Sequence, residues 1–199
     1  MSGPIEYLIV GLGNPGEEFD NTPHNLGFMV MNALAGTHAI RISRKENLSY
    51  VGLGTIKGKP VALAQPQTYM NLSGPAVKGL LARYELGVEK LVLVYDELAL
   101  PWGSLRIRPN GSSAGHNGVK STIASLGTEE FVRVRLGIRP AEAAGDSGQT
   151  GPIPNGAKYV LAQFRRAQMK EVEEVVARGC AAVESIIADG VDKSMAIFN

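Results

Sequence analysis

The stretch LVLVYD at residues 91–96 decides the fold of this chain. Its unbroken apolar run predicts a strand that is buried on both faces, as the strands of parallel sheets are. Asp96 comes directly after the run and marks the predicted end of that strand. A second run, YLIV at residues 7–10, ends in Gly11 and predicts another buried strand. Strands of this kind, separated by helical patterns, indicate an α/β protein.

Helical and strand patterns alternate along the rest of the chain. Helices are predicted over residues 25–38, 73–84, 118–125 and 167–188, the second of them capped by Ser73. Strands are predicted over residues 50–55, 61–64, 105–108 and 132–138. The first two form a hairpin around KGKP, and the last two alternate apolar and basic residues, as half-exposed strands do. We therefore predict an α/β fold, namely a single-domain three-layer sandwich in which helices flank a twisted mixed β-sheet.

Residues 139–157 differ from the rest of the chain because they are rich in Gly, Pro, Ala and Ser and show little periodicity. We predict a long mobile loop there rather than a domain boundary, since too little chain follows to build a second core. A single domain over residues 1–199 is the resulting prediction.

Composition excludes several classes of protein. The chain has 199 residues, of which 44% are hydrophobic and 20% charged, which is ordinary for a globular protein and rules out disorder, collagen and coiled coil as its main state. The single cysteine, Cys180, excludes a disulfide framework and a Cys-based zinc site, and its place in an apolar helical stripe predicts a core residue. No apolar run approaches the ~18 residues of a membrane span, and no signal-peptide pattern opens the sequence, so we expect a cytoplasmic protein without membrane contact.

Charge is unevenly distributed along the chain. Residues 1–40 hold acidic residues and no Lys or Arg. Residues 101–139 hold the basic residues Arg106, Arg108, Lys120, Arg133, Arg135 and Arg139 against only Glu129 and Glu130. Such an excess suits contact with phosphates, but on charge alone a solvated basic strand face is the favoured explanation.

The segment GLGNPG at residues 11–16 fits the glycine pattern of dinucleotide-binding proteins. Two features argue against that interpretation. Glu17, Glu18 and Asp20 follow at once and would repel a pyrophosphate at the helix N-terminus. No acidic residue lies about 20 positions further on, where the ribose would need one. We therefore do not predict a dinucleotide site.

Polar side chains stand at the ends of the predicted elements, where ligand sites of open α/β sheets lie. They are Asn14, His24, Asn71, Asp96, His116 and Asn117. An imidazole takes a proton from water at neutral pH, a carboxylate orients that imidazole, and Asn amides hold carbonyl groups without adding charge. No serine or cysteine lies in a nucleophile motif, which favours attack by water. The same residues also suit turns and helix caps, and the residues alone leave that alternative open.

Metal chemistry is not predicted. His24 and His116 are isolated in the sequence, no H-x-x-x-H pair exists, and Asp96 alone cannot complete a site.

Taken together in their order, several motifs make the chain resemble the bacterial-type peptidyl-tRNA hydrolases over almost its full length. The blocks that carry the resemblance are LIVGLGNPG at 8–16, TPHNLG at 22–27, QPQTYMNLSG at 65–74, DEL at 96–98 with Pro101 and Gly103, GHNG at 115–118 and RVRLGI at 133–138.

The resemblance implies hydrolysis of the ester that joins a peptide to the terminal ribose of tRNA, which recycles tRNA from abandoned translation. By the same resemblance, His24 is the catalytic base, Asp96 keeps it basic and oriented, and Asn14 distinguishes a blocked peptidyl group from a free aminoacyl group. The implied substrate contacts come from Asn71, Asn117, Phe19 and Tyr69 around the peptide and the tRNA end, and from Arg108 and Arg135 at tRNA phosphates. The implied partner is peptidyl-tRNA, bound through its acceptor end and 3′ terminus by a monomer, and no metal or organic cofactor is expected.

The chain departs from the family pattern at two positions beside the implied site. Pro23 stands where the family usually has Arg, so it removes a charge and restricts the backbone before His24. Phe19 stands where the family commonly has Tyr, so one hydroxyl is lost.

Two other functions remain open at this point. A non-catalytic RNA-binding protein on the same fold would keep the basic face but would not need His24, Asp96 and Asn14 together. A general hydrolase of small esters or amides would explain the site but not the arginines, and its Michaelis constant for a tRNA substrate would not depend on salt.

Overall fold

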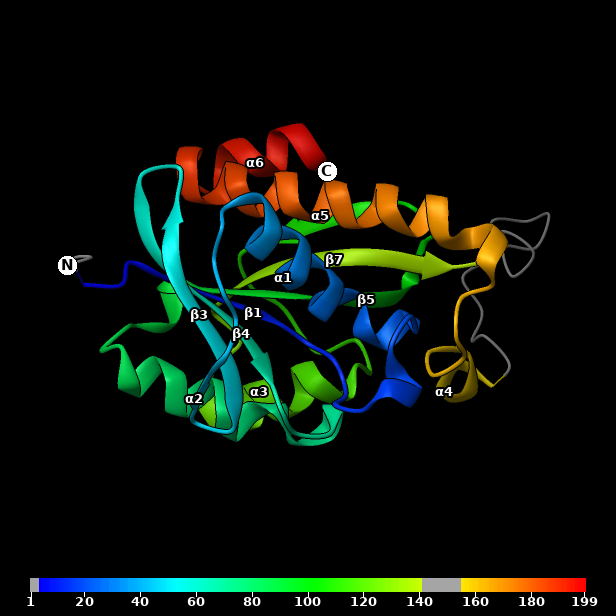
Figure 1. Ribbon diagram of the computed structural model, residues 1–199, viewed down its shortest axis with the longest axis horizontal. Helices are drawn as coiled ribbons and strands as arrows, with labels where there is room; N and C mark the ends of the chain where they lie inside the picture. Colours follow the sequence, from blue (N-terminus) through cyan, green and yellow to red (C-terminus); the bar gives the residue numbers. More distant parts are fainter. Residues whose placement is uncertain (1–3, 141–154) are drawn as a thin grey trace.

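The computed structural model describes residues 4–140 and 155–199 and shows one mixed β-sheet between two layers of helices (Figure 1). The strands lie in the order β2-β3-β4-β1-β5-β7-β6. The central strands β4, β1, β5 and β7 are parallel, whereas β2, β3 and β6 pair with their neighbours in antiparallel fashion. The strand bounds are β1 (Tyr7–Gly11), β2 (Arg44–Glu46), β3 (Ser49–Ile56), β4 (Lys59–Pro66), β5 (Leu91–Pro101), β6 (Leu105–Arg108) and β7 (Val132–Arg139).

The helices cover both faces of the sheet, with α1, α5 and α6 on one face and α2 and α3 on the other (Figure 1). Their bounds are α1 (Leu26–Thr37), α2 (Ser73–Arg83), α3 (Asn117–Leu126), α4 (Gly156–Tyr159), α5 (Met169–Asp189) and α6 (Val191–Phe198). Short 3-10 turns, Pro23–Asn25 and Met70–Leu72, directly precede α1 and α2. The predicted fold class, a three-layer α/β sandwich with a mixed sheet, is therefore confirmed.

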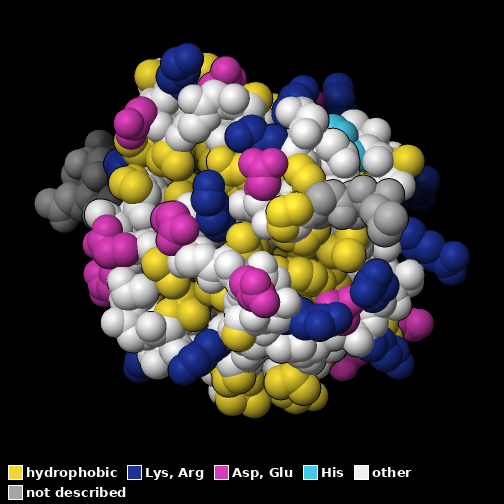
Figure 2. Space-filling model, turned by 90° about the vertical axis from the view of Figure 1, so that its left-hand side faces the viewer, with side chains coloured by type: hydrophobic (Ala, Val, Ile, Leu, Met, Phe, Trp, Pro, Cys, Tyr) yellow, Lys and Arg dark blue, Asp and Glu magenta, His cyan; other side chains and the backbone are white. Residues whose placement is uncertain are grey.

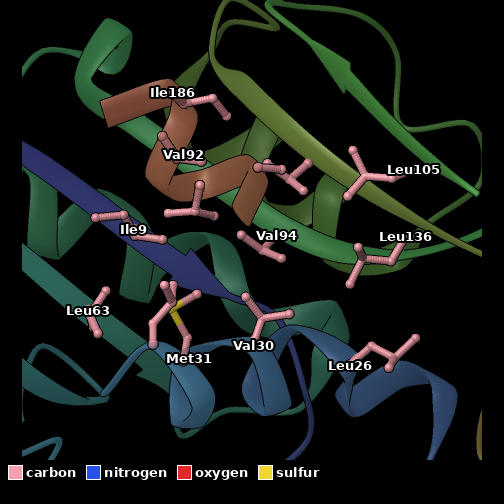
Figure 3. Close-up of a cluster of buried hydrophobic side chains, with 14 of the residues drawn as sticks. Ile9, Leu26, Val30, Met31, Leu63, Val92, Val94, Leu105, Leu136 and Ile186 are labelled. Atoms are coloured by element: carbon pink, nitrogen blue, oxygen red, sulfur yellow. The ribbon is translucent and has the colours of Figure 1, made fainter. Parts of the chain in front are cut away.

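Each face of the sheet packs its own apolar cluster, because alternate residues of a strand point to opposite faces. Ile9, Val92 and Val94 pack with α1 and α5 on one face, as Figure 3 shows for Val30 and Ile186. Leu8, Val10, Leu91 and Leu93 pack with α2 and α3 on the other face. None of the helices in the described ranges has the length and apolar character that crossing a membrane would require.

Two glycines let α1 lie directly on the strands. A Cβ on Gly27 would collide with backbone atoms of Leu12 and Val94, and a Cβ on Gly11 would collide with the carbonyl of Gly27. The glycine motif after β1 therefore serves close packing between a helix and a strand. This packing holds the 3-10 turn that carries His24 against the end of β1.

The prediction that the strand ends before Asp96 is wrong, since β5 continues to Pro101. β1 stops pairing at Gly11, opposite Val94, whereas β7 goes on pairing with β5 beyond Asp96. Asp96 thus lies inside a strand, at the point where the neighbouring strand on one side has ended. The carboxylate therefore lies beyond the end of β1, where the side chains of His24 and His116 contact it.

Two smaller predictions also need correction, and a third stays a prediction over most of its length. β7 is buried rather than half-exposed, because Val134, Leu136 and Ile138 pack in the same apolar cluster as α5 and the side chain of Arg133 is buried on the other face. Ser73 does not cap α2 but is its first residue, and its hydroxyl donates to the carbonyl of Met70 (2.9 Å). The predicted loop at 139–157 falls mostly on residues 141–154, which lie outside the described ranges.

Candidate active site

A histidine and an aspartate that are far apart in the sequence meet at the central strands. His24 Nδ1 lies 2.9 Å from both carboxylate oxygens of Asp96, although the two residues are 72 positions apart. The backbone N–H of His24 donates to the carbonyl of Val160 (3.0 Å), which fixes the turn that carries it. Because an ionised carboxylate only accepts, Nδ1 carries the proton and Nε2 is left as the free base. This is the arrangement of a general base with its orienting acid.

A second histidine, His116, completes the surroundings of the carboxylate. Its Nδ1 accepts from the backbone N–H groups of Gly118 and Val119 at the start of α3 (3.2 and 3.3 Å). The proton must therefore sit on Nε2, which donates to Oδ1 of Asp96 (3.1 Å). The sequence identified His116 as a polar residue at an element end but did not assign it to the site; its neighbour Asn117 was the residue predicted.

The electrostatics of the carboxylate follow from these contacts. Burial alone would raise the pKa of Asp96, which is 1% exposed. The charge of His24 and the hydrogen bond from His116 outweigh that effect and hold the pKa of the carboxyl well below its usual range. Asp96 is therefore ionised throughout the neutral range and available to stabilise an imidazolium on His24.

The three side chains also form a group with the composition of a metal site. One ligand atom from each of His24, Asp96 and His116 lies within 4.8 Å of the others. The two histidines are isolated in the sequence but are neighbours in the structure, because both contact Asp96 of β5. One nitrogen of each histidine already lies at hydrogen-bond distance from Asp96, which accounts for the group without an ion.

Asn14 is held in place at both its backbone and its side chain. Its backbone N–H donates to Oδ1 of Asn25 (2.8 Å), and Nδ2 of Asn25 donates back to the Asn14 carbonyl (3.0 Å). The backbone N–H of Met70 donates to Oδ1 of Asn14 (2.7 Å). This bond fixes which end of the amide is the donor, so Nδ2 of Asn14, which hydrogen-bonds to no residue in the described ranges, is free to donate to a ligand.

A cavity of about 320 Å³ brings the predicted residues together in front of His24. Asn14, Tyr69, Asn71 and Asn117 line it with His24. Tyr69 is largely exposed, and its ring stands edge-on to Phe19, with centroids 6.5 Å apart. The predicted contact residues around the peptide and the tRNA end are therefore neighbours, and an adjoining cavity of about 290 Å³ reaches past His24 to Asp96 and Ala114.

Pro23 does not displace the histidine that follows it. Thr22 adopts the extended backbone (φ −104°, ψ 156°) that a following proline favours, and Pro23 is the first residue of the 3-10 turn. His24 keeps its short contact with Asp96 in this arrangement. The proline therefore changes the charge next to the site rather than its geometry.

Three arginines gather at a separate cavity of about 310 Å³ beside β5, β6 and β7. Arg108 is exposed at the end of β6, and Arg135 pairs with Glu97 (2.8 Å). Arg133 is 1% exposed, stacks on Phe131 with its guanidinium 4.2 Å from the ring centre, and has no hydrogen-bond partner for any of its three nitrogens among the described residues. On the face shown in Figure 2, unlike at this cavity, basic and acidic side chains are mixed.

Arg133 is the residue that the sequence analysis missed at this second cavity. Its only signal was membership of the basic stretch, because alternation in β7 suggested a solvated side chain. A buried guanidinium without an anion is costly, so its presence points to an anionic ligand.

Comparisons with known proteins agree with this geometry. The family model for peptidyl-tRNA hydrolase matches residues 8–199. This chain belongs to the peptidyl-tRNA hydrolase family. Proteins named peptidyl-tRNA hydrolase from Solibacter usitatus and Koribacter versatilis are 49% and 42% identical to it over 193 residues, which cover 97% and 96% of this chain and 94% and 92% of theirs. The crystal structure of peptidyl-tRNA hydrolase from Acinetobacter baumannii superposes with a TM-score of 0.86 at 28% identity, covering 100% of this chain and 96% of that one.

The match spans the segments that build the site in this chain. It includes the 3-10 turn with His24, the strand with Asp96 and the start of α3 with His116. The resemblance inferred from the sequence motifs is confirmed at the level of the family.

Proposed function

We propose that His24, Asp96 and Asn14 carry out the hydrolysis of peptidyl-tRNA that membership of the family assigns to this enzyme. The observation that carries the proposal is the contact between His24 Nδ1 and Asp96, which leaves Nε2 as a free base in a cavity lined by amides. His24 Nε2 removes a proton from water while the water oxygen bonds to the ester carbonyl carbon. Asp96 stabilises the imidazolium formed in that step.

The second step returns the proton. The bond between the carbonyl carbon and the ribose oxygen breaks, and His24 Nε2 gives its proton to that oxygen, so that a free peptide carboxyl and a free tRNA hydroxyl result. Asn71 and Asn117 both line the cavity and offer amide donors to the carbonyl oxygen, which gains negative charge during the attack.

Asn14 supplies a physical basis for selecting blocked substrates. Its free Nδ2 group is a donor. A peptidyl group presents a neutral amide with a carbonyl acceptor at this position, whereas a free aminoacyl group presents an ammonium that can only donate. Two opposed donors repel each other, so aminoacyl-tRNA binds poorly and escapes cleavage.

The arginine cavity is the proposed contact for tRNA phosphates. Arg108 and Arg135 were predicted from the sequence for this role. Arg133, whose nitrogens have no hydrogen-bond partner among the described residues, lines the same cavity. A phosphate there would supply the anion that Arg133 lacks. Phe19 and Tyr69 lie at the other end of the site and are the proposed contacts for the 3′ terminus and the first peptide residue.

The proposed site needs no second subunit. All of its residues come from one chain, and both apolar clusters share one sheet, so we further propose a monomer with one domain over residues 1–199. A substrate that arises during translation supports a cytoplasmic location.

Release of the acyl group from N-acetyl-aminoacyl-tRNA, measured beside unblocked aminoacyl-tRNA, tests the proposed function. Cleavage of the blocked substrate alone is expected, with a Michaelis constant that rises steeply with salt, at a log–log slope of about 0.7 per phosphate contacted. Binding of tRNA without cleavage of either substrate would instead support a non-catalytic RNA-binding protein. Cleavage without salt dependence would support a general esterase.

A further inference from the structure

The cavities of this enzyme lie next to one another, because each shares lining residues with the next, and we call this row of cavities the groove. The arginine cavity meets the one beside Asp96 at Ala114, and that cavity meets the one in front of the base at His24. The groove then continues past Asn14 into a further cavity of about 430 Å³ that the proposed mechanism does not use. The base therefore lies in the middle of the groove, with arginines at one end.

The far end of the groove has a different chemistry, and we call it the carboxamide pocket. Its lining includes the amide side chains of Asn14, Asn21, Asn25, Asn32, Gln65 and Gln67. Phe28, Met29 and Tyr50 provide apolar and aromatic surface, and Asp20 is its single charged residue. Its volume is within the ~300–1,000 Å³ of ordinary ligand sites.

The amides of the carboxamide pocket are fixed by contacts between elements. Gln65 at the end of β4 is buried, and its Nε2 donates to the carbonyl of Phe28 (3.1 Å) and to Oδ1 of Asn32 (2.8 Å), both in α1. Oε1 of Gln65, Nδ2 of Asn32 and Nδ2 of Asn14 hydrogen-bond to no residue in the described ranges. Acceptors and donors are thus held in place without partners, ready for a ligand that offers both.

We propose that the carboxamide pocket binds the main chain of the peptide residues that precede the ester-linked residue. Main-chain amides offer one donor and one acceptor per residue whatever the side chains, which suits an enzyme whose substrates vary in peptide sequence. The pocket has no positive charge and one acidic residue, so it disfavours a phosphate backbone. This inference rests on the proposed function, since it takes the ester to lie at His24 and the tRNA to lie over the arginines.

The proposal predicts that kcat/KM rises with peptide length and that contacts in the carboxamide pocket cause this rise. An N-acetyl-aminoacyl group has one residue and ends beside Asn14, whereas a longer peptide continues into the pocket. The test compares kcat/KM for N-acetyl-tetraalanyl-tRNA with kcat/KM for N-acetyl-alanyl-tRNA, and the ratio of the two is the quantity measured.

Asn32→Trp fills the pocket from an exposed helix position, and it should lower that ratio about tenfold, the effect of losing one or two hydrogen bonds. Asn32→Leu removes the amide without blocking the space and should lower the ratio by a smaller factor. Thr37→Trp, an exposed position on the same helix outside the groove, is the matched control and should leave the ratio at its wild-type value.

The possible results distinguish a failure of the pocket proposal from a failure of the proposed function. An unchanged ratio in Asn32→Trp would overturn the proposal, and an equal loss on both substrates would assign the pocket to the tRNA 3′ end instead. If the tryptophan variant proves unfolded in thermal denaturation, the ratio in Asn32→Leu decides in the same way. Failure of the wild type to cleave the short substrate would contradict the proposed function itself, whatever the pocket binds.

Discussion

Replacing Asp96 by Asn is the substitution whose effect the geometry defines most sharply. Asp96 accepts from His24 and from His116, whose tautomer α3 fixes. An Asn oxygen can still accept from His116, but its Nδ2 group then faces His24. Because Nδ1 of His24 lies 2.9 Å from both carboxylate oxygens, the substitution turns one of its two acceptors into an opposed donor, which favours the tautomer with Nδ1 accepting and Nε2 protonated. The base is thereby lost while the shape of the site is kept.

The size of the effect has two independent estimates. A carboxylate and an imidazolium about 4 Å apart interact by about 4 kcal/mol at an effective dielectric constant of ~20, which corresponds to about 10³ in rate. The same substitution in a Ser-His-Asp triad lowers kcat about 10⁴-fold through the wrong tautomer. We therefore expect Asp96→Asn to lower kcat by roughly 10³–10⁴ while the dissociation constant for uncharged tRNA changes little.

The assay is single-turnover cleavage of N-acetyl-aminoacyl-tRNA over a range of pH. Because the pKa of Asp96 is held below its usual range, the wild-type rate should show no step from this carboxyl between pH 5 and 8. Its contribution to folding stability is present above pH ~3.9 and is lost only as pH falls through the lowered value. A rate for Asp96→Asn within tenfold of wild type would refute the tautomer argument.

Two further substitutions and one labelling test follow from burial. Arg133→Met should raise the melting temperature or leave it unchanged, because a buried unpaired charge is removed, yet it should weaken tRNA binding and reduce its salt dependence; unaltered tRNA binding would remove Arg133 from the interface. Gly27→Ala should cost roughly 3 kcal/mol in the free energy of unfolding, since its Cβ meets backbone atoms that cannot move aside; denaturant titration measures it, and a change below 1 kcal/mol would contradict the packing. Burial raises the pKa of Cys180 to about 11, so the native thiol should resist a thiol reagent at pH 8 and react once the chain is unfolded; rapid labelling of the native protein would contradict this.

The sequence predicted the layers of the fold because hydrophobic periodicity is a local signal. The runs before Gly11 and Asp96 indicated the central strands correctly. The error at Asp96 arose because the end of β5 depends on its pairing with β7, and that pairing is set by tertiary contacts. Two short elements, β2 and α6, lacked a periodic run long enough to be recognised.

The site was predictable in its residue types but not in its connections. The motifs identified His24 and Asp96, yet only the structure shows that His116 holds the same carboxylate. Arg133 was unpredictable for the opposite reason, since an arginine between apolar residues of a strand normally faces water. The link between Gln65 and Asn32 depends on how α1 lies across β4, which no local pattern records.

The central claim is that His24 acts as the base while other groups bind the substrate. The most direct test measures cleavage of N-acetyl-aminoacyl-tRNA in a single turnover, together with equilibrium binding of tRNA, for the wild type and for His24→Ala. The account predicts that cleavage falls by at least about 10³ in the variant while tRNA binding stays within a few-fold of wild type. Full cleavage by His24→Ala would contradict the account and place the base elsewhere in the groove.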